Sequence, residues 1–128
     1  MPQMQTHISH IGRIILTVTD QDEALRWYTE TLGFEVKADV AFGEGDRWLE
    51  VGPANGQTAI AIATSPTRAK PDSGNTCVAL VVDDVAATHA AFTELGVDVD
   101  PPMGGEGPVP AMFFFRDPDG NNLLAVGE

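Results

Sequence analysis

Two segments of the chain carry the same order of hydrophobic and polar positions. Each begins with a short run rich in β-branched residues, passes through an acidic residue into a helical pattern, and ends at a glycine before another apolar run. The first segment is Arg13–Val36 and the second is Cys77–Val99. The matched positions include Leu16 with Leu80, Val18 with Val82, Asp20 with Asp84 and Gly33 with Gly96, and the match skips Thr31. Such a repeat indicates two copies of one structural unit.

The first copy predicts a strand, a helix and three further strands. Ile14–Val18 is a β-branched run typical of a buried strand. Asp20 supplies a helix N-cap, with Glu23 three residues later in the capping-box position, and Gly33 ends the helix after about Leu32. The strands that follow are predicted at Phe34–Val40, Arg47–Val51 and Thr58–Thr64.

The second copy repeats this order after a segment rich in proline, glycine and polar residues, 65–75, which we interpret as a linker. A helix is predicted from the cap at Asp83–Asp84 to about Leu95, and Asp117–Gly120 fits a type I turn. The strands are predicted at Cys77–Val82, Val97–Val99, Ala111–Arg116 and Asn122–Val126.

We therefore expect a single α+β domain, residues 1–128, made of paired βαβββ modules at about 12–64 and 76–127. Each module leaves one sheet face uncovered by its helix. Pairing of the modules would bury these faces, curling the sheets into an incomplete barrel around a cleft, and clefts of this kind are where ligands bind.

The composition is that of an ordinary globular domain with an acidic surface. Hydrophobic residues make up 43% of 128 residues, enough for one core. Apolar runs such as Met112–Phe115 fall far short of the ~20 residues that span a bilayer, so no membrane association is expected. The net charge of −12 would repel nucleic acid and attract a cationic ligand, although acidity also simply favours solubility.

The N-terminal residues lack the basic-then-apolar pattern of a signal peptide. The single cysteine cannot form an internal disulfide, which agrees with a reducing compartment. We therefore expect the protein to be cytoplasmic.

Four motifs give the chain a resemblance to a known family. They are L-x-V-x-D at Leu16–Asp20, W-Y-x-x-x-L-G-F at Trp27–Phe34, V-D-D at Val82–Asp84 and F-R-D-P-D-G-N at Phe115–Asn121. With them the chain resembles the vicinal oxygen chelate superfamily, which includes glyoxalase I, extradiol dioxygenases, and fosfomycin- and bleomycin-resistance proteins. The resemblance covers nearly the whole chain, from about residue 12 to residue 127, and implies the paired βαβββ fold. It does not identify the reaction, because this fold carries several chemistries.

The enzymes of this superfamily hold a divalent metal with His, Gln or Glu side chains. The positions that match three of these ligands are occupied here by Arg13, Cys77 and Leu124, and a fourth falls in the strand that reads TAIAIA at 58–63. A guanidinium has no lone pair to donate, and leucine has no donor atom. We therefore expect neither a metal nor another cofactor, and metal-dependent chemistry is disfavoured.

Six residues are predicted to line the cleft. Arg13 either anchors an acidic group of a ligand or pairs with a nearby acid such as Glu50. Cys77 either becomes a reactive thiolate beside Arg13 or packs as an inert small hydrophobe. Strand alternation turns only one face of Met112–Phe115 inward, and the sequence leaves open which one. The predicted cleft residues are Arg13, Trp48, Cys77, Met112, Phe114 and Leu124; no catalytic residue is assigned.

Three functions follow from this pattern. The favoured one is a metal-free binding protein that resembles the bleomycin-resistance branch, which implies a homodimer that sequesters a cationic or aromatic drug or metabolite. The alternative is an enzyme with an atypical site: a glyoxalase-like lyase or isomerase, or a dioxygenase-type enzyme. The third is a non-catalytic partner module without a ligand.

Overall fold

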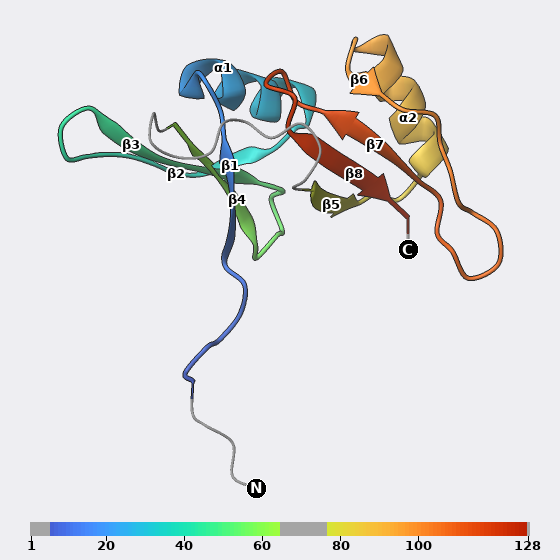
Figure 1. Cartoon of the computed structure of the whole chain (residues 1–128), viewed down its shortest axis with the longest axis horizontal. Coiled ribbons are helices and arrows are strands. Elements are labelled where there is room, and N and C mark those ends of the chain that lie inside the picture. Colours follow the sequence, from blue (N-terminus) through green and yellow to red (C-terminus); the bar gives the residue numbers. More distant parts are fainter. Residues whose placement is uncertain (1–5, 65–76, 128) are drawn as a thin grey trace, which may run out of the picture.

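The computed structural model describes residues 6–64 and 77–127, and shows two four-stranded sheets, one for each repeat (Figure 1). The predicted linker lies outside the described residues. The first sheet has the order β1-β4-β3-β2 and the second β5-β8-β7-β6. The strands are β1 (Arg13–Thr17), β2 (Glu35–Phe42), β3 (Asp46–Gly52), β4 (Ala59–Ala63), β5 (Cys77–Val81), β6 (Asp98–Val99), β7 (Met112–Arg116) and β8 (Asn122–Val126).

Both sheets share one topology, which confirms the paired βαβββ architecture. In each, the first strand runs parallel to the last, and the remaining neighbours are antiparallel. The first strand of each repeat, β1 or β5, therefore lies at a sheet edge. The two sheets are not closed into a barrel within one chain, so the cleft that the sequence predicted between them is not formed by one copy alone.

Both helices begin directly after the aspartates that were predicted to cap them, Asp20 and Asp84. α1 (Gln21–Arg26) begins after Asp20, whose carboxylate accepts the N–H of Glu23 at 3.1 Å. α2 (Val85–Glu94) begins after Asp84, which accepts the N–H of Ala87 at 2.9 Å. No helix in the described part of the chain has the length and apolar character that crossing a membrane requires.

The first helix differs from the prediction in its second half, which is a π-helix, η1 (Trp27–Thr31). A π-helical turn holds one residue more than an α-helical turn. The N–H of Phe34 bonds the carbonyl of Tyr28, six residues back, whereas in the second copy Val97 bonds Phe92, five residues back. The π-helix therefore accommodates the one extra residue of the first copy, the one that the sequence match had to skip.

A common hydrophobic core lies between the sheets and the helices. Alternate residues of β7 and β8 face it, and in the first module Leu16 of β1 and Val18 just after it point into the core while Ile15 faces away. In the second module, Phe92 of α2 packs on Phe115 with ring centroids 5.0 Å apart. The buried members are Leu16, Val18, Ala24, Tyr28, Leu49, Val51, Ile60, Ile62, Phe113, Phe115, Leu123 and Ala125.

The turn between β7 and β8 joins the two modules. Asp117 is buried and accepts the hydroxyl of Tyr28 at 2.8 Å. Asp119 accepts the hydroxyl of Thr19 at 2.7 Å, and the Asn121 amide donates to the carbonyl of Thr17 at 3.0 Å. These contacts fix the second module against the helix side of the first, and they leave the opposite face of each sheet open.

Candidate functional site

Three predicted or neighbouring polar side chains form one group on the open face of the first sheet. Glu50, 6% exposed, accepts hydrogen bonds from Arg13 Nε and from Trp48 Nε1, the latter at 2.6 Å. The guanidinium carbon of Arg13 lies 5.8 Å from the centroid of the Trp48 ring. Trp48 remains 40% exposed. The group thus holds an indole ring in a set orientation on the surface while the charges of Arg13 and Glu50 compensate each other.

Small residues on β4 make this group possible. In the sheet register, Arg13 of β1 is opposite Ala59 and Glu50 of β3 is opposite Ala61. Residues opposite each other across neighbouring strands point to the same face. Because the intervening strand presents only alanine methyl groups there, the long Arg13 side chain reaches across β4 to Glu50. The pairing of Arg13 with Glu50, one of the two expected roles of Arg13, is therefore observed.

The open face of the second sheet carries the predicted apolar residues. Phe114 is opposite Leu124 in the register, and Met112 is opposite Val126. All are half-buried, whereas Phe113 and Phe115 on the other face are buried in the core. The structure thus settles the alternation that the sequence left open.

Cys77 opens β5 opposite Asn122, and its side chain lies outside the described residues. The predicted residues fall on two separate sheets. Among the described residues no hydrogen bond, ion pair or ring contact joins the Arg13–Trp48 group to Phe114 or Leu124. In a single copy the predicted residues therefore form two groups, each on its own sheet, and all six do not lie together.

The residues at the positions of the family's metal ligands do not fit a metal. Arg13 is cationic and ion-paired, Leu124 is apolar, and the open face of β4 consists of alanines. Over residues 6–64 and 77–127, no group of three or more His, Cys, Asp or Glu side chains could hold a metal ion. No reaction step is derived through such an ion.

Other arginines are held in surface ion pairs away from this group. Arg47 bonds Asp39 and Asp22, and Arg116 bonds Asp98 and Asp100. The hydrogen bonds from these guanidinium groups lower the pKa of Asp39, Asp98 and Asp100 below the ordinary range for aspartate. These pairs compensate part of the acidic surface and leave Arg13 as the arginine of the open face of the first sheet.

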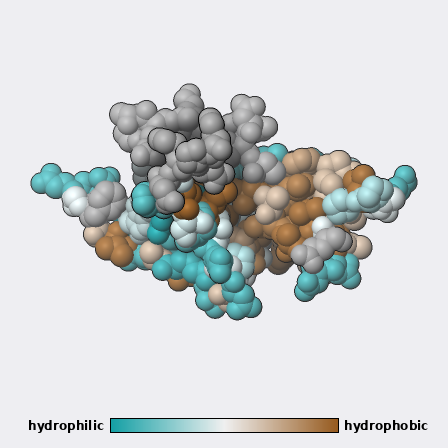
Figure 2. All heavy atoms as spheres, turned by 90° about the horizontal axis from the view of Figure 1, so that it is seen from below, coloured by the Kyte–Doolittle hydropathy of each residue, from teal (hydrophilic) through white to brown (hydrophobic). Residues whose placement is uncertain are grey.

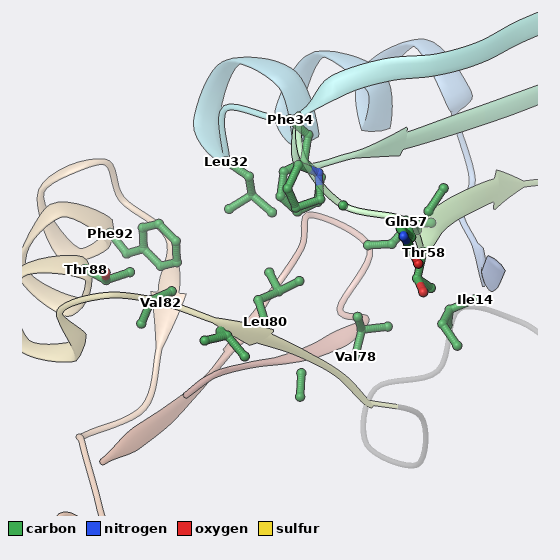
Figure 3. Close-up of a pocket in the computed structure, with 16 residues that line it drawn as sticks. Ile14, Leu32, Phe34, Gln57, Thr58, Val78, Leu80, Val82, Thr88 and Phe92 are labelled. Atoms are coloured by element: carbon green, nitrogen blue, oxygen red, sulfur yellow. The ribbon is translucent and has the colours of Figure 1, made fainter. Parts of the chain in front are cut away.

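A pocket with a volume of about 610 Å³ lies between the modules (Figure 3). The sequence predicted a cleft between the repeats, but with a different lining. Leu32 and Phe34 form the wall of the pocket from the first module, and Val78, Leu80 and Phe92 its wall from the second. Of the predicted residues whose side chains are described, none lines it. No sequence signal marks it, because the matched strand positions carry the same residues, Leu16 with Leu80 and Val18 with Val82, and they differ only in burial.

A smaller polar pocket of about 180 Å³ adjoins Arg13 and Glu50. His10 and Lys37 contribute to its lining, and Lys37 donates to the carbonyl of Ala54 at 3.1 Å. It gives the open face of the first sheet a polar margin beside the apolar area around Trp48.

The family model described as the Glyoxalase/Bleomycin resistance protein/Dioxygenase superfamily matches residues 7–124. The chain belongs to this superfamily. Among curated proteins, it is 28% identical over 119 residues to the uncharacterized protein YetH of Bacillus subtilis (strain 168), covering 91% of this chain and 97% of YetH.

Solved structures of the superfamily share the whole fold. TnmS3, an antibiotic binding protein from Streptomyces sp. CB03234, is 35% identical with a TM-score of 0.81, covering 96% of this chain and 98% of TnmS3. A superfamily member from Sphaerobacter thermophilus DSM 20745 is 30% identical with a TM-score of 0.83, covering 94% of this chain and 98% of that one. Superfamily membership and the predicted fold are thereby confirmed.

Proposed function

We propose that this superfamily member is a metal-free binding protein for a small planar organic molecule, cationic or aromatic, and that it works as a homodimer. The observation that carries the proposal is the Trp48 ring, held by Glu50 and Arg13 yet 40% exposed on the open face. A fixed, exposed indole offers a stacking surface to a flat conjugated ligand at little cost in side-chain entropy.

The open faces support a homodimer. Val40 on the first sheet is 57% exposed and Val81 on the second is 63% exposed. Figure 2 shows hydrophobic residues gathered on the underside of the molecule, over the part that holds the second module. Contiguous apolar surface is rarely left bare on a soluble protein. In the proposed dimer, the first sheet of one copy faces the second sheet of the other, which brings Arg13 and Trp48 opposite Met112, Phe114, Leu124 and the position of Cys77.

The net charge of the chain and its similarity to an antibiotic binding protein support a cationic or aromatic ligand. A chain with a net charge of −12 attracts cations at long range. Within the site, the Arg13–Glu50 pair compensates itself, so stacking and apolar contact are left as the main sources of affinity. TnmS3, at 35% identity, is an antibiotic binding protein. We keep the cytoplasm as the expected compartment, because a single cysteine is typical of a reducing environment.

The first test is a thermal-shift and fluorescence titration of the purified protein with acridine orange, bleomycin and phenanthrene, each alone, and with Zn²⁺ or Mn²⁺ alone. A ligand at 100 times its Kd adds about 2.7 kcal/mol of stability. We expect stabilisation by at least one of the planar compounds and quenching of tryptophan fluorescence on binding. The quenching and the affinity are expected to be lost in Trp48→Phe.

Trp27→Phe is the matched control, because Trp27 lies on the helix side of the sheet, away from the open face. Its ring packs edge-on against Tyr28, with the ring centroids 4.9 Å apart. It should bind as the unaltered protein does. The proposal is contradicted if none of the organic probes binds, or if Trp48→Phe binds them with unchanged affinity. Stabilisation by a divalent metal together with turnover of a glutathione hemithioacetal would replace it with the enzyme alternative.

A further inference from the structure

The pocket between the modules is lined from the helix side of the second sheet by Val78, Leu80 and Val82. Ala59 and Val81, which face the open side of their sheets, also line it. Its walls come from both repeats: Leu32 and Phe34 follow the first helix, while Val78 and Leu80 belong to β5 and Phe92 to α2. In Figure 3 the side chains of Leu32 and Phe34 stand on the opposite side of the hollow from Leu80 and Val78. The pocket thus forms where the two copies meet.

Comparison of the two repeats shows that the fold itself does not require this hollow. In the first copy Leu16 and Val18 are buried in the core, whereas the matching Leu80 and Val82 of the second copy are half-buried and line the pocket. The helices differ in the same sense. The first carries Tyr28, which is buried and reaches Asp117, and the matching Phe92 of the second faces the pocket and the second sheet.

The matched helix positions Ala24 and Thr88 differ in the same way. Ala24 is buried in the first core, and Thr88 places a hydroxyl and a methyl group at the pocket wall. The matched residues are therefore buried in the first copy and only half-buried in the second, where they face the pocket. The pocket opens to solvent, since its lining residue Val81 is 63% exposed, and an apolar pocket that solvent reaches is accessible to a ligand.

The chemistry of the walls defines what fits. Among residues 6–64 and 77–127, no charged residue lines the pocket, although charged residues make up 20% of the chain. Its polar side chains are Gln57, Thr58 and Thr88, which offer hydrogen bonds without charge. A volume of about 610 Å³ is in the range of small-molecule pockets. A charged ligand would lose its hydration there without gaining an ionic partner.

We propose that the inter-module pocket is a second binding site, specific for an uncharged and largely apolar small molecule that hydrogen-bonds to Thr88 or Gln57. The residues that carry this proposal, Thr88, Gln57 and Val82, are not part of the Arg13–Trp48 group of the open-face site, although Ala59 and Val81 line the pocket and also stand on the open faces. The occupant of the pocket would bridge the two modules, contacting β5 and α2 of the second and the end of the first helix.

The test uses N-phenyl-1-naphthylamine, a neutral apolar probe whose fluorescence rises in apolar surroundings. We expect the full-length protein to bind one probe per chain. Thr88→Phe, which fills the pocket from α2, should raise the Kd about tenfold or more, equivalent to ~1.4 kcal/mol. Ala90→Phe is the matched control, because Ala90 is exposed on the same helix and does not line the pocket.

A second variant guards against a folding defect. Val82→Phe narrows the pocket from the β5 side and should weaken the probe in the same way. In the unaltered protein, nuclear Overhauser contacts between the probe and the Thr88 methyl group report the position without any substitution. Trp48→Phe, which tests the open-face site, should leave probe binding unchanged, so failure of one site is distinguishable from failure of the other.

The proposal is overturned if the probe does not bind the unaltered protein, or if Thr88→Phe and Ala90→Phe weaken it equally. It is also overturned if Overhauser contacts place the probe on the open face. Thermal stabilisation by Thr88→Phe without any binding of the probe would identify the pocket as a packing defect and would equally exclude a ligand role.

Discussion

Tyr28 is the only tyrosine of the chain, and it is fully buried with its hydroxyl donating to Asp117. Burial raises the pKa of Tyr28 far above its ordinary value of about 10, and the neighbouring carboxylate of Asp117 raises it further. Asp117 also accepts the backbone N–H of Asn121 at 2.8 Å. One phenol thus takes part both in the core of the first module and in the junction with the second.

The raised pKa predicts how stability depends on alkaline pH. Above about pH 10 the unfolded chain loses the phenolic proton and the folded chain keeps it, so the free energy of unfolding falls as pH rises. Tyrosinate absorbance should then appear only together with unfolding. Tyr28→Phe should cost about 1–3 kcal/mol at neutral pH and flatten the alkaline dependence. Tyrosinate formation near pH 10 in the folded protein would contradict the burial and bonding of Tyr28.

At the scale of elements, η1 shows how a local insertion is absorbed. The N–H of Leu32 bonds the carbonyl of Trp27, five residues back, at 3.4 Å. This wider turn holds Thr31, the residue without a counterpart in the second copy. The bond from the N–H of Phe34 to the carbonyl of Tyr28 joins the residues that match Val97 and Phe92 in the second copy. The extra residue therefore changes the helix and leaves the start of β2 in the matching position.

Deleting Thr31 tests this interpretation. We expect the π-helix to become α-helical and the protein to keep its cooperative unfolding, with a loss of about 1 kcal/mol, the size typical of a single change. Deleting Thr93, at a comparable place in α2, is the control and should cost several times more, because α2 holds no extra residue. Circular dichroism during thermal unfolding measures both. Equal losses would show that η1 is needed for the fold.

At the scale of the whole molecule, the proposed dimer depends on the open faces of the two sheets. The contacts of Tyr28, Thr19 and Asn121 hold the modules together on the helix side, so one chain cannot turn its two open faces toward each other without breaking them. A second copy can cover both faces at once. The ligand site of the proposed function is then shared, and its halves belong to different copies.

A charge on the open face should therefore break the assembly. Sedimentation velocity of the unaltered protein is expected to show a dimer of the 13.6 kDa chain. Val40→Asp should be a monomer, because the new carboxylate would be buried without a partner in the dimer contact. Ala86→Asp, on the exposed surface of α2, should remain dimeric. A monomeric unaltered protein at micromolar concentration would contradict the shared site.

The sequence by itself determined the elements and their order, because each depends on residues a few positions apart. The β-branched run of β1, the caps at Asp20 and Asp84 and the stop at Gly33 are local signals, and their repetition indicated the paired modules. The motif carriers also identified the superfamily. What they could not supply was the face of each strand, since alternation leaves both faces equivalent until something packs on one of them.

Only the tertiary structure decided the contacts between distant segments. Arg13 reaches Glu50 because β4 lies between them with alanines on that face, and Phe113 rather than Phe114 is buried because α2 covers that side of β7. The pocket beside Thr88 likewise depends on where the first module ends against β5. Each of these outcomes rests on side-chain volume and register across segments far apart in the chain, which no local pattern encodes.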